Sequence, residues 1–193
     1  MAKAVCIIQG HPHAAGGHFC HALADSYARG AEAAGAPVSR LDVAALDPAP
    51  LRDPGDFAVP PEGPMRAAQE AVRAAGHLVV IFPLWLGTMP AVVKAFFEQL
   101  GRGEFALAQR GGGWPEQKLK GKSARIVVTM GMPGLAYRLI FGAAGVRCLR
   151  NGVLGMAGMR PVRETFIGGV DGLGEAGRTR WLARMEGMGR SQA

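Results

Sequence analysis

Apolar and polar residues follow two different periods along this chain, one typical of strands and the other typical of helices. Residues 4–8 and 78–82 are continuous apolar runs containing Val and Ile, which suits strands buried on both faces of a parallel sheet. Residues 38–43 alternate between apolar and polar side chains, which predicts a strand nearer the sheet edge. With two further segments rich in β-branched and aromatic residues, the predicted strands are 4–8, 38–43, 78–82, 123–130 and 160–167.

Between these runs, apolar positions recur every three or four residues, as in helices that bury one face. Thr88 is the predicted N-cap of the helix after the central strand, with Pro90 in its first turn. The predicted helices are 18–34, 64–75, 88–100, 135–145 and 174–188, with 147–155 prolonging the fourth after a break. The proline-rich segment 44–63 predicts a surface loop, and the glycine-rich segment 101–122 predicts a long loop or β-hairpin.

The order of these elements predicts the fold. Strands alternate with helices, and right-handed crossovers between parallel strands then give an α/β, doubly wound, five-stranded parallel sheet of the flavodoxin-like kind, in a single domain spanning residues 1–193. In such a sheet the loops after the first, third and fourth strands meet at one edge, where ligands bind. Those loops are residues 9–18, 83–88 and 129–137.

The loop after the central strand is apolar, whereas most loops are polar. Pro83 ends the strand because it has no N–H for the ladder, and Leu84-Trp85-Leu86-Gly87 follows. At the carboxyl end of a central strand, these side chains predict a surface for a flat, partly apolar ligand. The alternative, that Trp85 lies in the core or in a dimer interface, is at least as well supported by the loop alone.

Composition and charge narrow the classes of protein that fit. The chain has 193 residues, of which 49% are hydrophobic and 19% charged, so one globular domain is expected. Its apolar runs are too short to span a bilayer and the N-terminus leads directly into a strand, which predicts a cytoplasmic protein without membrane insertion. The net charge of +7 is spread without a dense basic run, so we expect attraction of anionic cofactors rather than nucleic-acid binding. The three cysteines, Cys6, Cys20 and Cys148, predict buried reduced thiols.

Three segments resemble one known family. Residues 82–91, FPLWLGTMPA, are similar to the signature of the flavin-dependent NAD(P)H:quinone oxidoreductases with a flavodoxin-like fold, which include DT-diaphorase, the modulator-of-drug-activity proteins and the potassium-efflux ancillary reductases. The turn at His11 and the turn at 129–131, with Tyr137 downstream, resemble that family's other two flavin-contacting loops. The likeness extends over about residues 3–170.

The resemblance implies a bound flavin, FMN or FAD with FMN slightly preferred, held by the three loops. The first loop and the helix N-terminus after it would hold the flavin phosphate, although the hydroxyl residues usual there are missing. The second loop would lie against the isoalloxazine ring, and the third would form the opposite wall, with glycine at 131 because the backbone must approach the ring closely. The cofactor-binding residues implied are His11, Gly17, His18, Phe19, Cys20, Pro83, Leu84, Trp85, Leu86, Thr129, Met130, Gly131 and Met132.

The resemblance also implies a reaction. NADPH or NADH would pass hydride to the flavin, and a small-molecule acceptor of the quinone, azo or nitro class would then take it, in a ping-pong mechanism. Tyr137, the predicted catalytic residue, matches a tyrosine that in some members works with a histidine to stabilise charge on the reduced flavin, but Ala143 stands where that histidine would be. Because members are usually dimers with active sites completed across the interface, a homodimer is expected.

Two alternatives come from other classes of protein. His11, His13, His18 and His21 lie within eleven positions, together with Cys20, and this density predicts a zinc or copper site if further ligands complete it. The sequence offers no remote Cys or His set that would do so, and the prediction is that no metal is bound. The second alternative is a non-enzymatic flavodoxin-fold regulator that binds a partner protein through residues 44–63.

Overall fold

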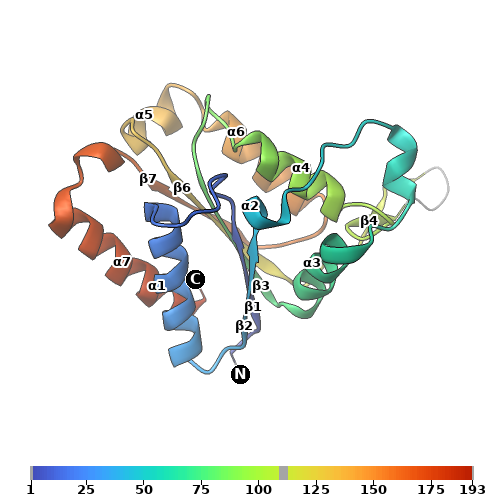
Figure 1. Cartoon of the computed structure of the whole chain (residues 1–193), viewed down its shortest axis with the longest axis horizontal. Helices are drawn as coiled ribbons and strands as arrows, with labels where there is room; N and C mark the ends of the chain where they lie inside the picture. The colour runs from blue at the N-terminus through green and yellow to red at the C-terminus, as the bar shows by residue number, and fades with distance from the viewer. Residues whose placement is uncertain (1, 109–112, 193) are drawn as a thin grey trace.

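The computed structural model describes residues 2–108 and 113–192. Five parallel strands form a central sheet in the order β2-β1-β3-β6-β7, with helices on both faces (Figure 1). The strands of this sheet are β1 (Val5–Gln9), β2 (Val38–Asp42), β3 (His77–Pro83), β6 (Ser123–Thr129) and β7 (Val162–Ile167). This strand order confirms the predicted doubly wound α/β fold, and β2 lies at an edge, as its alternating pattern predicts.

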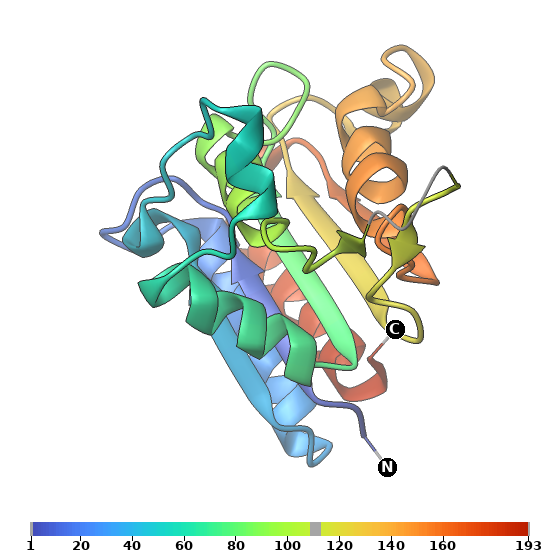
Figure 2. The same ribbon diagram turned by 90° about the vertical axis from the view of Figure 1, so that its right-hand side faces the viewer.

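Helices cover the sheet in two layers (Figure 2). On one face lie α1 (Phe19–Ala33) and α7 (Gly174–Ser191). On the other lie α3 (Gly63–Ala74), α4 (Ala91–Leu100) and α6 (Ala144–Arg147), which continues as the π-helix η2 (Cys148–Gly155). The shorter elements are α2 (Val43–Leu46), η1 (Pro54–Ala58), α5 (Gly134–Leu139), η3 (Val170–Gly172) and an antiparallel pair of β4 (Leu107–Ala108) and β5 (Glu116–Gln117).

The continuous apolar runs supply both hydrophobic cores. In β1, Val5 and Ile7 belong to the core under α1 and α7, whereas Cys6 and Ile8 belong to the core under α3 and α4, and all four are fully buried. Side chains alternate between the faces of a strand, so a strand covered on both faces must be apolar at every position. The same reason explains the uninterrupted apolar run in β3.

Glycines let α1 and α7 pack at backbone contact. A Cβ at Gly30 would lie 1.9 Å from the carbonyl oxygen of Glu186, and a Cβ at Gly189 would lie 2.1 Å from that of Tyr27. Neither position admits a side chain without separating the helices. These two glycines therefore let the terminal helix α7 pack directly against α1, although fewer than half of its residues are apolar.

The start of α4 differs from the prediction. Its N-cap is Pro90, so Thr88 does not cap the helix and Pro90 lies outside the first turn. Thr88 instead pairs with Trp85 through two backbone hydrogen bonds, of 2.9 and 3.0 Å, which close the loop after β3 into a tight turn. The turn uses the backbone of Thr88, and the helix therefore begins later.

Residues 44–63, predicted as a surface loop, contain two short helical elements. The Asp42 carboxylate accepts hydrogen bonds from the N–H groups of Ala44 and Ala45 and so begins α2. The Asp53 carboxylate accepts from Gly55 N–H at the start of η1. Aspartate is a common N-cap residue, but the prolines of this segment favoured the prediction of a loop over that of short helices.

Three further expectations can be compared with the structure. The helix predicted over 135–145 is interrupted, because α5 ends at Leu139 and Ala143 adopts a left-handed conformation with φ of 48° before α6. Cys6 and Cys20 are buried free thiols, as predicted, but Cys148 is exposed on η2. Among the described helices, none combines the length and the apolar character needed to cross a membrane.

Candidate functional site

The three predicted loops meet at the carboxyl ends of β1, β3 and β6, the upper edge of the sheet in Figure 1. Gly10 N–H donates to the Ile81 carbonyl at 2.7 Å, which joins the first loop to β3. Leu84 N–H donates to the Thr129 carbonyl at 2.8 Å, which joins the second loop to β6. The Cys20 thiol lies 3.2 Å from the Thr129 hydroxyl, so the start of α1 contacts the third loop as well.

The second loop displays its apolar side chains outward. The side chain of Trp85 is 52% exposed and that of Leu86 is fully exposed, whereas Pro83 and Leu84 are partly buried. Leu86 and Gly87 both have positive φ, of 47° and 79°, and Leu86 is a residue type that rarely adopts this conformation. The tight turn thus forces outward two side chains that would ordinarily be buried, which indicates a surface that another molecule covers.

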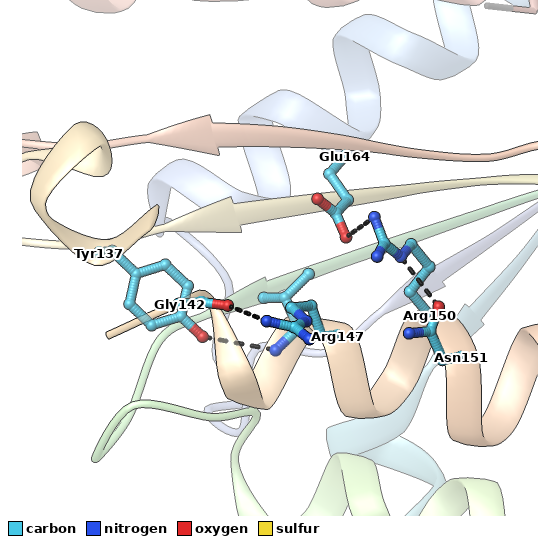
Figure 3. A network of polar contacts seen from close by, with 7 residues as sticks. Tyr137, Gly142, Arg147, Arg150, Asn151 and Glu164 are labelled. Atoms are coloured by element: carbon cyan, nitrogen blue, oxygen red, sulfur yellow. Dashed lines mark hydrogen bonds and ion pairs between the residues drawn. The ribbon is translucent and has the colours of Figure 1, made fainter. Parts of the chain in front are cut away.

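Tyr137 and Gly145 support this loop from below. The Tyr137 hydroxyl donates to the Gly87 carbonyl at 2.9 Å, and Val146 N–H donates to the same hydroxyl at 3.4 Å. Figure 3 shows the ring of Tyr137 pointing from α5 toward the start of the α6 helix. A Cβ at Gly145 would lie only 2.3 Å from the Gly87 carbonyl oxygen, so the helix and the turn are in backbone contact.

The buried hydroxyl of Tyr137 therefore positions the second loop. Its side chain is 1% exposed, and burial raises the pKa of the hydroxyl, so it remains protonated and can donate to Gly87. Beside it, Arg147 donates to the Gly142 carbonyl at 3.3 Å and closes the chain between α5 and α6 (Figure 3). A catalytic role for Tyr137 stays a prediction, and the hydrogen bonds of this hydroxyl give it a positioning role.

The third loop forms a wall beside the second. Thr129 and Met130 are buried at its base, while Met132 is 37% exposed at its rim. A Cβ at Gly131 would lie 2.9 Å from the Asp171 carboxylate, so a larger residue there would require this exposed side chain to move aside. Sequence reasoning missed Asp171, and no pattern around it gives a signal for its approach to the third loop.

The first loop gathers four imidazole rings, here called the histidine cluster: His11, His13, His18 and His21. The ring centroid of His18 lies 3.8 Å from that of His11, 5.0 Å from that of His13 and 5.7 Å from that of His21. Gly16 and Gly17, with φ of 75° and 74°, turn the chain back so that His13 Nδ1 reaches within 2.7 Å of His18 Nε2. His18 is also the N-cap residue of α1 and makes no side-chain capping bond.

Several polar atoms near this cluster have no hydrogen-bond partner among the described residues. Gln9, which ends β1, is only 5% exposed, and its Nε2 donor is unsatisfied. Both ring nitrogens of His21 are buried without a partner. Unsatisfied buried polar groups are costly, so Gln9 and His21 would gain from a polar partner, an ordered water or a ligand, at this end of α1. The signal for Gln9 was available in the sequence, because a polar residue ends an otherwise apolar strand.

The cysteine and the metal alternative can be assessed on the same geometry. Burial raises the pKa of Cys20 to about 11, so its thiol is neutral and does not act as a nucleophile at neutral pH. Within residues 2–108 and 113–192, no group of three or more His, Cys, Asp or Glu side chains is arranged to hold a metal ion. Within the histidine cluster His11 stacks on His18, and His13 Nδ1 shares a hydrogen bond with His18 Nε2, which differs from the convergent nitrogen lone pairs of a metal site.

Comparison with known proteins places the chain in a family. A family model described as flavodoxin-like fold matches residues 3–186. The chain belongs to this family. A comparison with curated protein sequences gave no match.

Solved structures share the family fold along nearly the whole chain. Smu.1420 from Streptococcus mutans UA159 is 25% identical, with a TM-score of 0.82, over 97% of this chain and 99% of that one. The NAD(P)H:quinone oxidoreductase from Methanothermobacter marburgensis is 19% identical, with a TM-score of 0.77, over 100% and 98%. An FMN-dependent NADH-azoreductase from Bacillus anthracis str. Ames Ancestor, solved in complex with FMN, is 11% identical, with a TM-score of 0.77, over 98% of each chain.

The geometry of the three loops suits the flavin that the family resemblance implies. Trp85, Leu86 and Met132 offer exposed apolar surface for a flat ring system. The unsatisfied Gln9 donor and the histidine cluster at the start of α1 offer donors for an anionic group. The structure thus brings the predicted residues of the three loops together at one edge, with the apolar and polar halves of the site on different loops.

Proposed function

We propose that this protein is a flavin-dependent NAD(P)H oxidoreductase that reduces quinone-type acceptors, with azo and nitro compounds as the related alternatives. FMN is the proposed flavin. When bound, it supplies the redox chemistry, taking hydride from NAD(P)H in one half-reaction and passing it to the acceptor in the next. Family membership and solved structures named quinone reductases and azoreductases support this proposal.

The meeting of the three loops is the observation on which the proposal depends. Backbone hydrogen bonds join Gly10 to Ile81 and Leu84 to Thr129 across β1, β3 and β6, so the three loops keep a fixed spacing. A site built on strand ends is held more rigidly than one on free loops. Trp85 and Met132 are exposed on two of these loops and the histidine cluster lies on the third, an arrangement suited to a ligand with a flat ring and an anionic tail.

The protein residues have binding and positioning roles in this proposal. Trp85 and Leu86 would lie against the ring system, and Met132 would form the facing wall, which together would exclude water from one side. The tight turn of 85–88 keeps these side chains in place through its own backbone bonds and through Tyr137. The proposed reaction needs no catalytic base or nucleophile from the protein, because the cofactor carries the chemistry.

Spectroscopy of the purified protein tests the proposed function. The protein, supplied with FMN and freed of excess, should retain a flavin absorption band that bleaches when NADPH or NADH is added without oxygen and returns when a quinone is added. An initial-rate pattern of parallel lines in double-reciprocal plots would support the ping-pong order. Failure to retain either FMN or FAD would refute the proposal and leave the non-enzymatic binding protein as the better account.

Trp85→Ala tests the placement of the flavin ring. Removing an aromatic side chain from the ring contact should weaken FMN binding by about ten-fold, equivalent to about 1.4 kcal/mol. Trp114→Ala is the matched control, because Trp114 is likewise exposed but lies beside β5, away from the three loops. Equal FMN dissociation constants for both variants, measured by fluorescence titration, would contradict this placement.

A second copy of the chain is the proposed partner for the apolar surface around the site. Besides Trp85 and Leu86, the segment from α5 to α6 carries four apolar residues that are each more than half exposed: Leu135, Leu139, Ile140 and Phe141. Large exposed patches of this kind mark interaction sites. Sedimentation analysis should show a dimer that Ile140→Lys converts to a monomer, whereas a monomeric wild-type protein would refute the homodimer.

A further inference from the structure

The outer edge of β7 is open. This strand ends the order β2-β1-β3-β6-β7, and in the part of the chain that the structure describes no strand pairs with its other side. Met130 N–H donates to the Ile167 carbonyl at 2.9 Å, so the odd-numbered residues of β7 direct their backbone groups toward β6. Alternate residues of a parallel strand direct these groups to opposite sides. A row of backbone donors and acceptors therefore faces away from the sheet, at Val162, Glu164 and Phe166.

Two cavities lie along this edge, one toward each end of β7. The first, of about 540 Å³, is lined by Val162 and by residues of η2 and β5. The second, of about 470 Å³, is lined by Thr165 and Phe166 together with residues of α5 and α7. Because adjacent residues of a strand point to opposite faces, the second cavity passes across the open edge of β7. The two cavities and the strand edge between them are here called the β7 groove.

The β7 groove is strongly basic. Among the described residues that line it there is one carboxylate, Glu164, which forms an ion pair with Arg150 of η2 at 3.2 Å (Figure 3). The guanidinium of Arg184 lies 4.9 Å from the ring centroid of Trp181, a contact that favours an ordered position for this cation. The arginines that line the groove are Arg125, Arg138, Arg150, Arg160 and Arg184.

This charge decides which kind of molecule fits the groove. A second copy of the chain, pairing its own β7 with this one, would bring two sets of arginines together, which like-charge repulsion opposes. A single small anion would contact the arginines of one cavity and leave the row of backbone groups unpaired. An extended peptide with acidic side chains would satisfy both, because its backbone and its carboxylates follow the same repeat as the strand.

We propose that the β7 groove binds an extended acidic segment of a partner protein, which pairs with β7 as an additional strand of the sheet. Backbone groups of the segment would pair with those of Glu164 and Phe166, and its carboxylates would contact Arg138 and Arg184 in one cavity and Arg160 in the other. The groove follows the side of the sheet, whereas the proposed flavin site lies at the carboxyl ends of β1, β3 and β6. Partner binding therefore does not depend on the proposed function.

Fluorescence anisotropy of the full chain with three labelled eight-residue peptides tests the proposal. A peptide of alternating Glu and Val should bind, and its affinity should fall as the salt concentration rises. A peptide of alternating Lys and Val should not bind. The Glu-Val peptide methylated at each backbone nitrogen keeps the charge but cannot donate to β7, so it should bind at least about ten-fold more weakly. By NMR, the Glu-Val peptide should slow hydrogen exchange of the Glu164 and Phe166 N–H groups.

A pair of double variants tests the arginines. Arg138→Gln with Arg184→Gln should weaken binding of the Glu-Val peptide by about ten-fold, because two charge contacts are lost. Arg52→Gln with Arg66→Gln is the matched control, since it removes the same charge from exposed residues that line neither cavity. It should leave the affinity within about two-fold of wild type. Urea denaturation midpoints equal to that of the wild type would show that both double variants are folded.

Three results would overturn the proposal. Equal weakening by the two double variants would mean that the peptide responds to overall charge and not to the groove. Equal affinity for the methylated and unmethylated peptides would mean that no strand pairs with β7 and that the groove attracts anions only. Slow exchange at Glu164 and Phe166 that appears without peptide, as the protein concentration rises, would identify a second copy as the occupant. None of these results bears on flavin binding.

Discussion

Gly145→Ala should disturb the flavin site through the loop it contacts. A Cβ at this position would lie 2.3 Å from the Gly87 carbonyl oxygen and 2.6 Å from the Cα of Thr88, whereas ordinary contacts begin at 3.4 Å. Both obstacles are backbone atoms, so the turn of residues 85–88 or the start of α6 must move by roughly 1 Å. Overpacking of this kind costs about 1–3 kcal/mol. Alanine is more favourable than glycine within a helix by about 0.5–1 kcal/mol, which offsets part of this cost. The net loss of folding free energy should therefore be about 1–2 kcal/mol.

The displaced turn carries Trp85, so FMN affinity should fall about ten-fold in addition to the loss of stability. Gly152→Ala is the matched control, because the nearest atom to a Cβ there is the Cys148 sulfur at 4.0 Å, in the continuation of the same helix. Urea denaturation of the apo protein measures stability, and fluorescence titration with FMN measures affinity. Equal free energies of unfolding for the two variants, or unchanged FMN affinity in Gly145→Ala, would refute the view that this contact positions the loop.

Two further predictions concern the fold. Gly189→Ala should lower the free energy of unfolding, measured by urea denaturation, by about 2–3 kcal/mol, because its Cβ would lie 2.1 Å from the Tyr27 carbonyl oxygen. Gly187→Ala is the control and should be neutral or stabilising, because the space around its Cβ is open. Similar losses of stability in both variants would disprove close packing of α1 and α7. His77 is buried between the hydroxyls of Tyr27 and Ser123, and burial lowers its pKa to about 4. The unfolded chain therefore binds the proton first, and stability should fall as the pH drops from about 6.5 toward 4, by roughly 2 kcal/mol between pH 7 and 5. His77→Gln should reduce that pH-dependent loss by the same amount, and an unchanged loss would contradict the assignment.

The sequence by itself determined the sheet and its binding edge. A parallel strand buried on both faces must be apolar along its length, so the uninterrupted runs at 4–8 and 78–82 marked β1 and β3, and the run 126–128 marked the centre of β6. Chirality then leaves few ways to connect them, and the three loops had to converge. The unusual apolar loop with Trp85 was visible for the same reason, because an apolar segment without helical or strand periodicity has to face something other than water.

Contacts between distant segments had no local signal. The Tyr137 hydroxyl reaches Gly87 across fifty residues, and Gly145 permits that approach only because the α6 backbone lies against the turn. The same holds for the glycines that join α1 to α7 and for the carboxylate of Asp171 beside Gly131. A short-range pattern cannot encode these neighbours, since each depends on where two separate elements pack.

The histidine-rich stretch shows both contributions in one place. Its composition was plain in the sequence and favoured a ligand loop over a metal site, because no remote Cys or His set completes a ligand shell. Tertiary structure set the arrangement of the rings: the left-handed glycines at 16 and 17 return the loop onto α1, so that His11 and His13 pack against His18. Periodicity follows from burial, which the sequence encodes locally, whereas the direction in which each ring faces depends on backbone turns and packing that only the folded chain sets.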